Sequence, residues 1–120
     1  MPKTILREEL KQKIDRGDHF RLVETLGEEK YRQAHLPDAI NLPPDRIQDL
    51  APEILPDKDE TIVVYCASPT CNASANAARA LADMGYTDIR DYEGGKSDWV
   101  DHGLPVERVD DRPEATASSS

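Results

Sequence analysis

Apolar residues near the N-terminus recur at the spacing of a helix. Leu6, Leu10 and Ile14 are four residues apart and therefore share one helical face. Thr4 has a side chain that suits an N-cap position, and Gly17 is a natural end for the helix. The pattern predicts an N-terminal helix that starts at Thr4 and stops before Gly17.

The clearest strand pattern lies in the middle of the chain. Residues 61–66 are β-branched and apolar almost without interruption, which is typical of a parallel strand buried on both faces. A helical turn at 45–50 precedes a loop that Pro52 and Pro56 punctuate. Weaker patterns predict strands at 20–24, 39–42 and 88–92 and helices at 28–34, 74–84 and 97–102.

Strands that alternate with helices predict an α/β sheet with helices on both faces. Ligands of such sheets bind beyond the carboxyl ends of the strands. The strand at 61–66 brings Cys66 to that place. This position is the main physical indication of where a functional site lies.

The length and composition predict one domain. The chain has 120 residues, of which 38% are apolar and 32% charged, and its core must be mainly aliphatic because it has one Trp and one Phe. We expect a single domain over residues 1–109. Residues 110–120 have almost no apolar side chains to bury, so we expect a disordered tail there.

The charge excludes some classes of partner. A net charge of -9 argues against nucleic acid and against an anionic membrane surface, both of which require basic faces. No apolar run approaches the roughly 20 residues that span a bilayer, and the N-terminus has no signal-peptide pattern. We expect a cytoplasmic monomer whose thiols are kept reduced.

The segment after the central strand is a candidate active-site loop. A loop between a strand and a helix near Ser74 can turn its backbone N–H groups inward and form an anion-binding cradle. A thiol there has a lowered pKa, and its thiolate attacks a sulfane sulfur, a disulfide or a phosphorus ester. The alternative for Cys66 is a small buried residue. The candidate loop consists of Ala67, Ser68, Pro69, Thr70, Cys71, Asn72, Ala73 and Ser74.

Several segments resemble one known family. Residues 34–43 (AHLPDAINLP) resemble the G-H-I-P-G-A-I-N-I-P segment of the rhodanese homology domain, and residues 62–66 (IVVYC) resemble the strand that presents its nucleophile. Residues 92–99 (YEGGKSDW) and 103–106 (GLPV) are similar to its closing G-G-x-x-x-W and G-x-P-V segments. Their order and separations are typical of the family, so the chain resembles a single-domain rhodanese-like sulfurtransferase over about residues 4–107.

This resemblance carries expectations about fold and chemistry. It implies a three-layer α/β/α domain with a central, mainly parallel sheet of about five strands. It also implies that Cys66 accepts sulfur as a persulfide, held by backbone amides of the loop, and passes it on. The expected partners are a small-molecule or protein-borne sulfur donor and a thiol or other nucleophilic acceptor. No metal or organic cofactor is implied.

The loop departs from the family's usual C-x-x-G-x-R-S pattern. With Ser74 at the helix start it is about two residues longer, it contains no Arg or Lys, and Pro69 lacks an N–H group. The sequence Glu24-Thr25-Leu26 replaces the usual Asp-x-Arg. One lost charge-assisted hydrogen bond costs about 1.5–3 kcal/mol, so we expect weak activity with thiosulfate. Phosphatases of related fold need Arg six residues after the cysteine, where this chain has Asn72.

Cys71 lies five residues after Cys66 in the same loop. If the loop curls, their Cα atoms come within the roughly 4.4–6.8 Å that a disulfide requires. Cys71 could then resolve a persulfide or sulfenate on Cys66, and its alternative is a small residue at the helix entry. Two other functions stay open: a thiol redox protein that uses both cysteines, and a non-catalytic rhodanese-like binding module.

Three further side chains have a structural interpretation. His35 is expected to brace the loop that leads to the strand at 39–42, and Trp99 is expected to anchor the core. Lys96 either supplies the positive charge nearest to the loop or lies in solvent. The spacing of the two cysteines and three histidines fits no zinc site.

Overall fold

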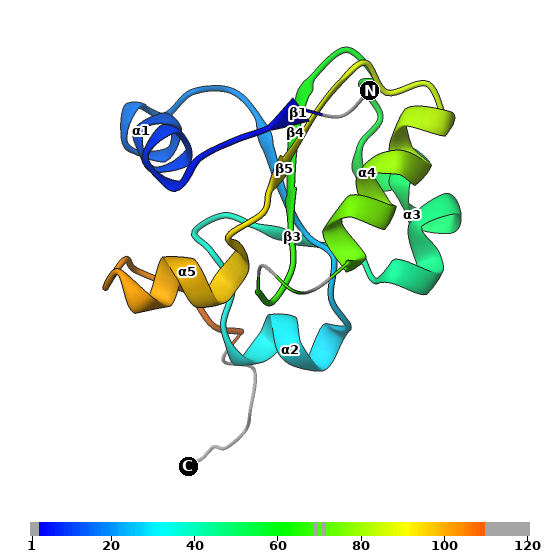
Figure 1. Cartoon of the computed structure of the whole chain (residues 1–120). Coiled ribbons are helices and arrows are strands. Elements are labelled where there is room, and N and C mark those ends of the chain that lie inside the picture. Colours follow the sequence, from blue (N-terminus) through cyan, green and yellow to red (C-terminus); the bar gives the residue numbers. More distant parts are fainter. Residues whose placement is uncertain (1–2, 69, 71, 110–120) are drawn as a thin grey trace.

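One sheet of parallel strands forms the centre of the molecule (Figure 1). The computed structural model describes residues 3–68, 70 and 72–109. Within these ranges the sheet has five strands in the order β1-β5-β4-β2-β3. The strands are β1 (Lys3–Thr4), β2 (Arg21–Glu24), β3 (Ile40–Asn41), β4 (Thr61–Tyr65) and β5 (Asp88–Tyr92). The sequence-based expectation of a parallel, five-stranded α/β sheet is confirmed.

Helices cover both faces of the sheet. Figure 1 shows α3 and α4 on one side and α1 and α5 on the other. None of the helices in the described part of the chain is long and apolar enough to cross a membrane. The helical elements are α1 (Arg7–Arg16), α2 (Glu28–Gln33), the 3₁₀ turn η1 (Pro44–Arg46), α3 (Ile47–Ile54), α4 (Ala73–Asp83) and α5 (Gly95–Asp101).

The central strand β4 is paired on both sides. It lies parallel to β2 along one edge and to β5 along the other, with Val64 opposite both Val23 and Asp91. Residues 62–65 are fully buried, as expected for a continuous apolar strand between two helical layers. Because the strands are parallel, their carboxyl ends meet at one edge of the sheet, and Cys66 lies there.

The alternation of side chains along β4 divides the core in two. Ile62 and Val64 pack with α3 and α4. Val63 and Tyr65 pack in a second cluster with Leu10 of α1 and, from α5, the fully buried Trp99. Trp99 is therefore a core anchor, as its sequence context predicts. Its indole Nε1–H donates a hydrogen bond of 2.7 Å to the Pro105 carbonyl.

The beginning of the N-terminal helix was placed too early from the sequence. Thr4 is not an N-cap residue; it belongs to β1 and pairs with Asp91. The helix begins at Arg7, and Leu6 is 66% exposed although its spacing placed it on the buried face. Ile5 is buried instead, because the added edge strand turns it toward the core. The end at Gly17 is confirmed, with a φ of 71° in the left-handed region that glycine favours.

The prediction of a loop around Pro52 is also wrong. The helical turn expected at 45–50 continues as α3, and Pro52 lies inside that helix. A tertiary contact holds the carbonyls at the end of this helix. The hydroxyl of Tyr86 donates to the carbonyls of Ala51 and Leu55, at 3.1 and 2.7 Å, and fastens the end of the helix.

Candidate active site

Cys66 follows the last residue of β4 and is 1% exposed. Its Sγ atom lies 3.6 Å from the hydroxyl oxygen of Ser74 and 3.9 Å from the carbonyl oxygen of Ser68. Ser74 is in the first turn of α4, where the unpaired backbone N–H groups of a helix favour negative charge. The sulfur therefore lies beside the start of α4, at the carboxyl end of the central strand.

Gly95 holds the beginning of the loop against α5. Its φ is +72°, and a Cβ atom there would lie 2.8 Å from both the Cys66 carbonyl oxygen and the Ser68 nitrogen. This close approach lets the Lys96 N–H donate to the Cys66 carbonyl and the Ser97 N–H donate to the Ala67 carbonyl, each at 2.8 Å. The sequence pattern of this segment did not show that Gly95 contacts the candidate nucleophile.

Lys96 is not a solvated surface residue. Its Nζ atom donates to a carboxylate oxygen of Glu24 at 3.1 Å and to the Lys30 carbonyl at 3.1 Å, and its side chain is 16% exposed. The other carboxylate oxygen of Glu24 accepts a hydrogen bond of 2.8 Å from the Tyr65 hydroxyl, which itself accepts one from the Leu36 N–H. The positive charge of Lys96 is therefore bound to a buried carboxylate.

In the sequence, Glu24 stands out only as a departure from the family pattern. Its side chain is fully buried, on the same face of β2 as Leu22. Burial raises the pKa of Glu24, while hydrogen bonds from Tyr65 and Lys96 and the charge of Lys96 act in the opposite direction. In the sequence, the burial of Glu24 was indicated by its position in a strand, two residues after a core leucine.

A second buried carboxyl group lies on the other face of the sheet and was missed in the sequence. Asp91 of β5 is 7% exposed, and its Oδ1 atom has no hydrogen-bond partner in the described structure. Burial raises the pKa of Asp91, the nearby charge of Glu93 adds to that effect, and a hydrogen bond with Ser74 opposes it.

The rest of the loop supplies polar groups without positive charge. The hydroxyl oxygens of Ser68 and Thr70 are 3.0 Å apart, and the Asn72 carbonyl accepts the first backbone hydrogen bond of α4 from Asn76. Ala67 and Ala73 present only methyl groups. Pro69 and Cys71 lie outside the described residues, so a second-thiol role for Cys71 stays a prediction.

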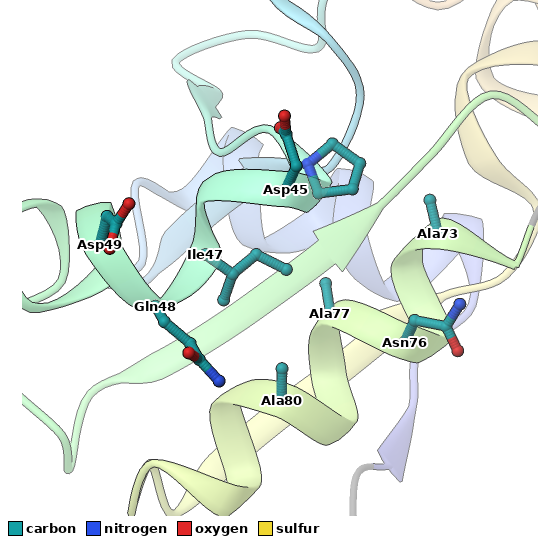
Figure 2. Close-up of a pocket in the computed structure, with 9 residues that line it drawn as sticks. Asp45, Ile47, Gln48, Asp49, Ala73, Asn76, Ala77 and Ala80 are labelled. Atoms are coloured by element: carbon teal, nitrogen blue, oxygen red, sulfur yellow. The ribbon is translucent and has the colours of Figure 1, made fainter.

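A groove of about 660 Å³ runs between α3 and α4 beside the loop (Figure 2). Ala73, the first residue of α4, lies at the loop end of this groove, and Cys66 is not among the lining residues. Figure 2 shows Gln48 and Ala77 facing the space between the two helices. The lining also includes Asp45 and Asp49, so it offers carboxylates rather than cations to an approaching molecule.

His35 braces the chain before β3, as expected. Its ring stacks on Tyr31 with centroids 4.0 Å apart, and its Nδ1 atom lies 2.9 Å from the Tyr31 carbonyl. The next residue, Leu36, donates its N–H to Tyr65. Within the described ranges, no group of three or more histidine, cysteine or carboxylate side chains is arranged to hold a metal ion.

Comparison with known proteins agrees with this geometry. A family model described as Rhodanese-like domain matches residues 6–102. The chain belongs to this family. Among its curated relatives, the rhodanese-like chain is 32% identical to a sulfurtransferase of Allochromatium vinosum over 106 residues, which are 88% of this chain and 95% of the relative.

Other relatives are longer than the matched region. The chain is 35% identical to the thiosulfate sulfurtransferase PspE of Escherichia coli over 57% of this chain and 64% of PspE. It is 33% identical to the HTH-type transcriptional regulator Rv0324 of Mycobacterium tuberculosis over 87% of this chain and 44% of that protein. These matches therefore cover less than two thirds of each relative.

Solved structures share the rhodanese-like fold. The BH2092 protein of Bacillus halodurans superposes with a TM-score of 0.83 at 27% identity, covering 89% of this chain and 77% of that one. The thiosulfate sulfurtransferase of Pseudomonas aeruginosa superposes with a TM-score of 0.79 at 26% identity, covering 88% of this chain and 20% of that one. The rhodanese-like assignment made from the three sequence segments is confirmed.

Proposed function

We propose that this rhodanese-like protein is a sulfurtransferase that carries sulfane sulfur as a persulfide on Cys66. The observation that carries the proposal is the place of the Cys66 sulfur, at the carboxyl end of the central strand and against the first turn of α4. Relatives named as sulfurtransferases support the same chemistry.

The proposed reaction has two displacements at sulfur. The Cys66 thiolate forms an S–S bond to the outer sulfur of the donor, and the donor's own S–S bond breaks with its electron pair on the leaving sulfur. A thiolate acceptor then attacks the outer sulfur of the Cys66 persulfide. The acceptor leaves as a persulfide, and Cys66 returns as a thiolate. No external oxidant or reductant is needed.

The charges around the site favour a persulfide donor over thiosulfate. Residues 67–73 contain no Arg or Lys, and the amino group of Lys96 is already bound to Glu24. The groove beside the loop has Asp45 and Asp49 in its lining, and these carboxylates repel a dianion. We therefore expect a small thiol persulfide or a protein-borne persulfide to load Cys66, and a thiol to accept the sulfur.

Intact-protein mass spectrometry tests the proposal. The reduced protein is exposed briefly to thiosulfate or to glutathione persulfide, and the expected result is the gain of one sulfur atom. Loading by glutathione persulfide should be about ten-fold faster or more, because thiosulfate lacks a charge-assisted hydrogen bond worth about 1.5–3 kcal/mol.

Two variants assign the sulfur. Cys66→Ser should abolish the gain, whereas Cys71→Ser should retain it. If neither donor loads a folded and reduced protein, the proposal is wrong, and the binding-module interpretation is favoured. If oxidants instead remove two hydrogens and link Cys66 to Cys71, reversibly and without sulfur gain, the redox interpretation is favoured.

A further inference from the structure

The Glu24–Lys96 ion pair is an unusual feature for the interior of a small domain. The Glu24 side chain is fully buried and that of Lys96 is 16% exposed, so both charges have lost most of their contact with water. Replacing such a pair by apolar side chains of similar volume often leaves stability unchanged or raises it, because removing two charges from water is costly. Stability alone therefore does not account for the pair, and its other contacts indicate what it does.

These contacts form a ring that begins and ends at Cys66. Lys96 is in the first turn of α5, and its backbone N–H donates to the Cys66 carbonyl at 2.8 Å. Its Nζ atom donates to Glu24 of β2 at 3.1 Å, and the other carboxylate oxygen of Glu24 accepts from the Tyr65 hydroxyl at 2.8 Å. Tyr65 is bonded covalently to Cys66, which closes the ring. A further bond from Nζ to the Lys30 carbonyl, at 3.1 Å, connects α2 to it.

The first turn of α5 orients two peptide groups of the loop. The Lys96 N–H donates to the Cys66 carbonyl at 2.8 Å. The Ser97 N–H donates to the Ala67 carbonyl at the same distance, so two successive carbonyls point at α5. In a trans peptide the N–H points opposite to the carbonyl of the same group, so the N–H groups of Ala67 and Ser68 both point away from α5. Successive N–H groups with a common direction form a concavity that binds negative charge.

These N–H groups point toward the side of the loop on which the sulfur lies. Figure 1 shows the carboxyl end of β4 between α5 and the start of α4. The Cys66 sulfur is on the α4 side, because it lies 3.6 Å from the Ser74 hydroxyl oxygen. The two helices therefore have separate tasks: α4 contacts the sulfur, and α5 orients the backbone beside it.

We propose that Glu24 and Lys96 are positioning residues for sulfur transfer at Cys66. The ion pair fixes the first turn of α5 against β2, and α5 in turn fixes the two carbonyls of the loop. The N–H groups of the same peptides then stabilise negative charge on the sulfur without having to reorient during the reaction. The pair acts through the backbone of α5 and of the loop. This role rests on the function proposed above and adds to it what holds the loop in its reactive form.

Alkylation and sulfur loading of Cys66 together test the inference. The reduced protein is treated at pH 7.5 with iodoacetamide or, separately, with glutathione persulfide, and mass spectrometry follows both rates. Lys96→Met should lower each rate by about ten-fold or more, because a small displacement of groups beside a reacting atom has an effect of that order or larger. Fragment spectra of the peptide distinguish Cys66 from Cys71.

Two further variants show whether the charge pair is responsible. Lys96→Arg keeps a positive charge and N–H donors near Glu24, so it should restore both rates to within about three-fold of wild type. Glu24→Gln should slow both reactions, since it removes the partner of Lys96. Combining Glu24→Gln with Lys96→Met should add less than half of the separate effect of Glu24→Gln, because the two residues act as a unit.

Leu55→Ala is the matched control for lost stability. Leu55 is 1% exposed and packs in the core on the α3 and α4 side, so its truncation leaves a destabilising cavity. Its carbonyl accepts a hydrogen bond from Tyr86, just before β5, which places it toward the amino end of the sheet, whereas Cys66 is at the carboxyl end. Folded Leu55→Ala should keep both rates within about two-fold of wild type, since the loop is untouched.

The inference is overturned if folded Lys96→Met reacts at wild-type rates, if Lys96→Arg is as slow as Lys96→Met, or if Leu55→Ala slows the reactions as much. If Lys96→Met does not fold, Glu24→Gln decides alone: slower alkylation supports the inference, and alkylation at the wild-type rate contradicts it.

Alkylation needs no sulfur donor, so the two proposals fail separately. A protein that accepts no sulfur but shows these alkylation rates loses the proposed function and keeps the role of the pair. A protein that accepts sulfur equally fast with and without Lys96 keeps the proposed function and loses that role.

Discussion

Two buried carboxyl groups lie on opposite faces of the same sheet, and their hydrogen bonding differs. Glu24 is bound on both oxygens, by the hydroxyl of Tyr65 and the amino group of Lys96. The Oδ1 atom of Asp91, by contrast, has no hydrogen-bond partner in the described structure. The first arrangement gives a buried carboxyl group a partner for each oxygen, whereas the second leaves a buried carboxyl oxygen without a donor.

The Glu24 pair is also connected to the loop that holds Cys66. The Glu24 pair fastens Lys96, whose backbone N–H holds the Cys66 carbonyl, so it supports the geometry of the loop. Asp91 makes no such contact with the backbone of the loop in the described structure, and its Oδ1 atom has no hydrogen-bond partner there. A buried charge with all of its partners adds order to the structure, whereas an unpartnered buried oxygen costs stability.

The largest expected effect on stability comes from breaking the Glu24 pair. Lys96→Met leaves a buried carboxylate without its cation, and we expect a loss of about 3–5 kcal/mol in the free energy of unfolding at pH 7.5. Urea denaturation measures this loss. Lys11→Met, which removes the exposed pair with Asp15, is the control and should cost less than about 0.5 kcal/mol.

The pH dependence of Lys96→Met sharpens the same test. Burial already raises the pKa of Glu24 in the folded protein, so protonation of Glu24 favours folding. That contribution is complete below the unfolded value of about 4.3 and is lost as pH rises through the higher folded value. Removing the cation raises the folded pKa of Glu24 further, so the deficit should shrink as pH falls toward 5. A deficit that is equal at both pH values would contradict the role assigned to Lys96.

A smaller effect is expected from Tyr65→Phe. The change leaves Glu24 without one donor and the Leu36 N–H without its acceptor, which should cost about 1–3 kcal/mol. Thermal and urea unfolding measure it. Tyr31→Phe removes one hydrogen bond, to the Ala39 carbonyl, from a less buried place, and its cost should be smaller. Equal stability losses for the two variants would show that the Glu24 network contributes no more to stability than the hydrogen bond of Tyr31.

The smallest effect on stability should come from Asp91→Asn. At pH 7.5 this effect should have the opposite sign to that of Lys96→Met. Burial and Glu93 raise the pKa of Asp91, so the ionised group opposes folding once pH exceeds the folded value. At pH 7.5 the asparagine variant should be as stable as wild type or more stable by up to about 1 kcal/mol. This advantage should disappear on acidification to about pH 4. A stability loss of several kcal/mol at pH 7.5 would instead assign Asp91 a purely structural role.

Much of the fold could be predicted from local patterns. β5 was placed with its observed bounds at 88–92, and β4 differs by one residue, because β-branched runs and glycine ends are local features of the sequence. The start of α1 could not be placed, because Ile5 and Thr4 follow an edge strand whose partner, β5, lies more than 80 residues later. The end of α3 likewise has a partner outside the helix, since the Tyr86 hydroxyl donates to the Ala51 carbonyl.

The sequence by itself determined the family, the central strand and the placement of Cys66 at the strand's carboxyl end, since each depends on a short contiguous pattern. Only the tertiary structure decided what surrounds the sulfur. Lys96 meets Glu24 across 72 positions of the chain, and Asp91 lies beside Val64 through the register of β4 and β5. Such contacts depend on which strands pair and in which register. Local hydrophobic patterns reveal the burial of each segment but not its partners.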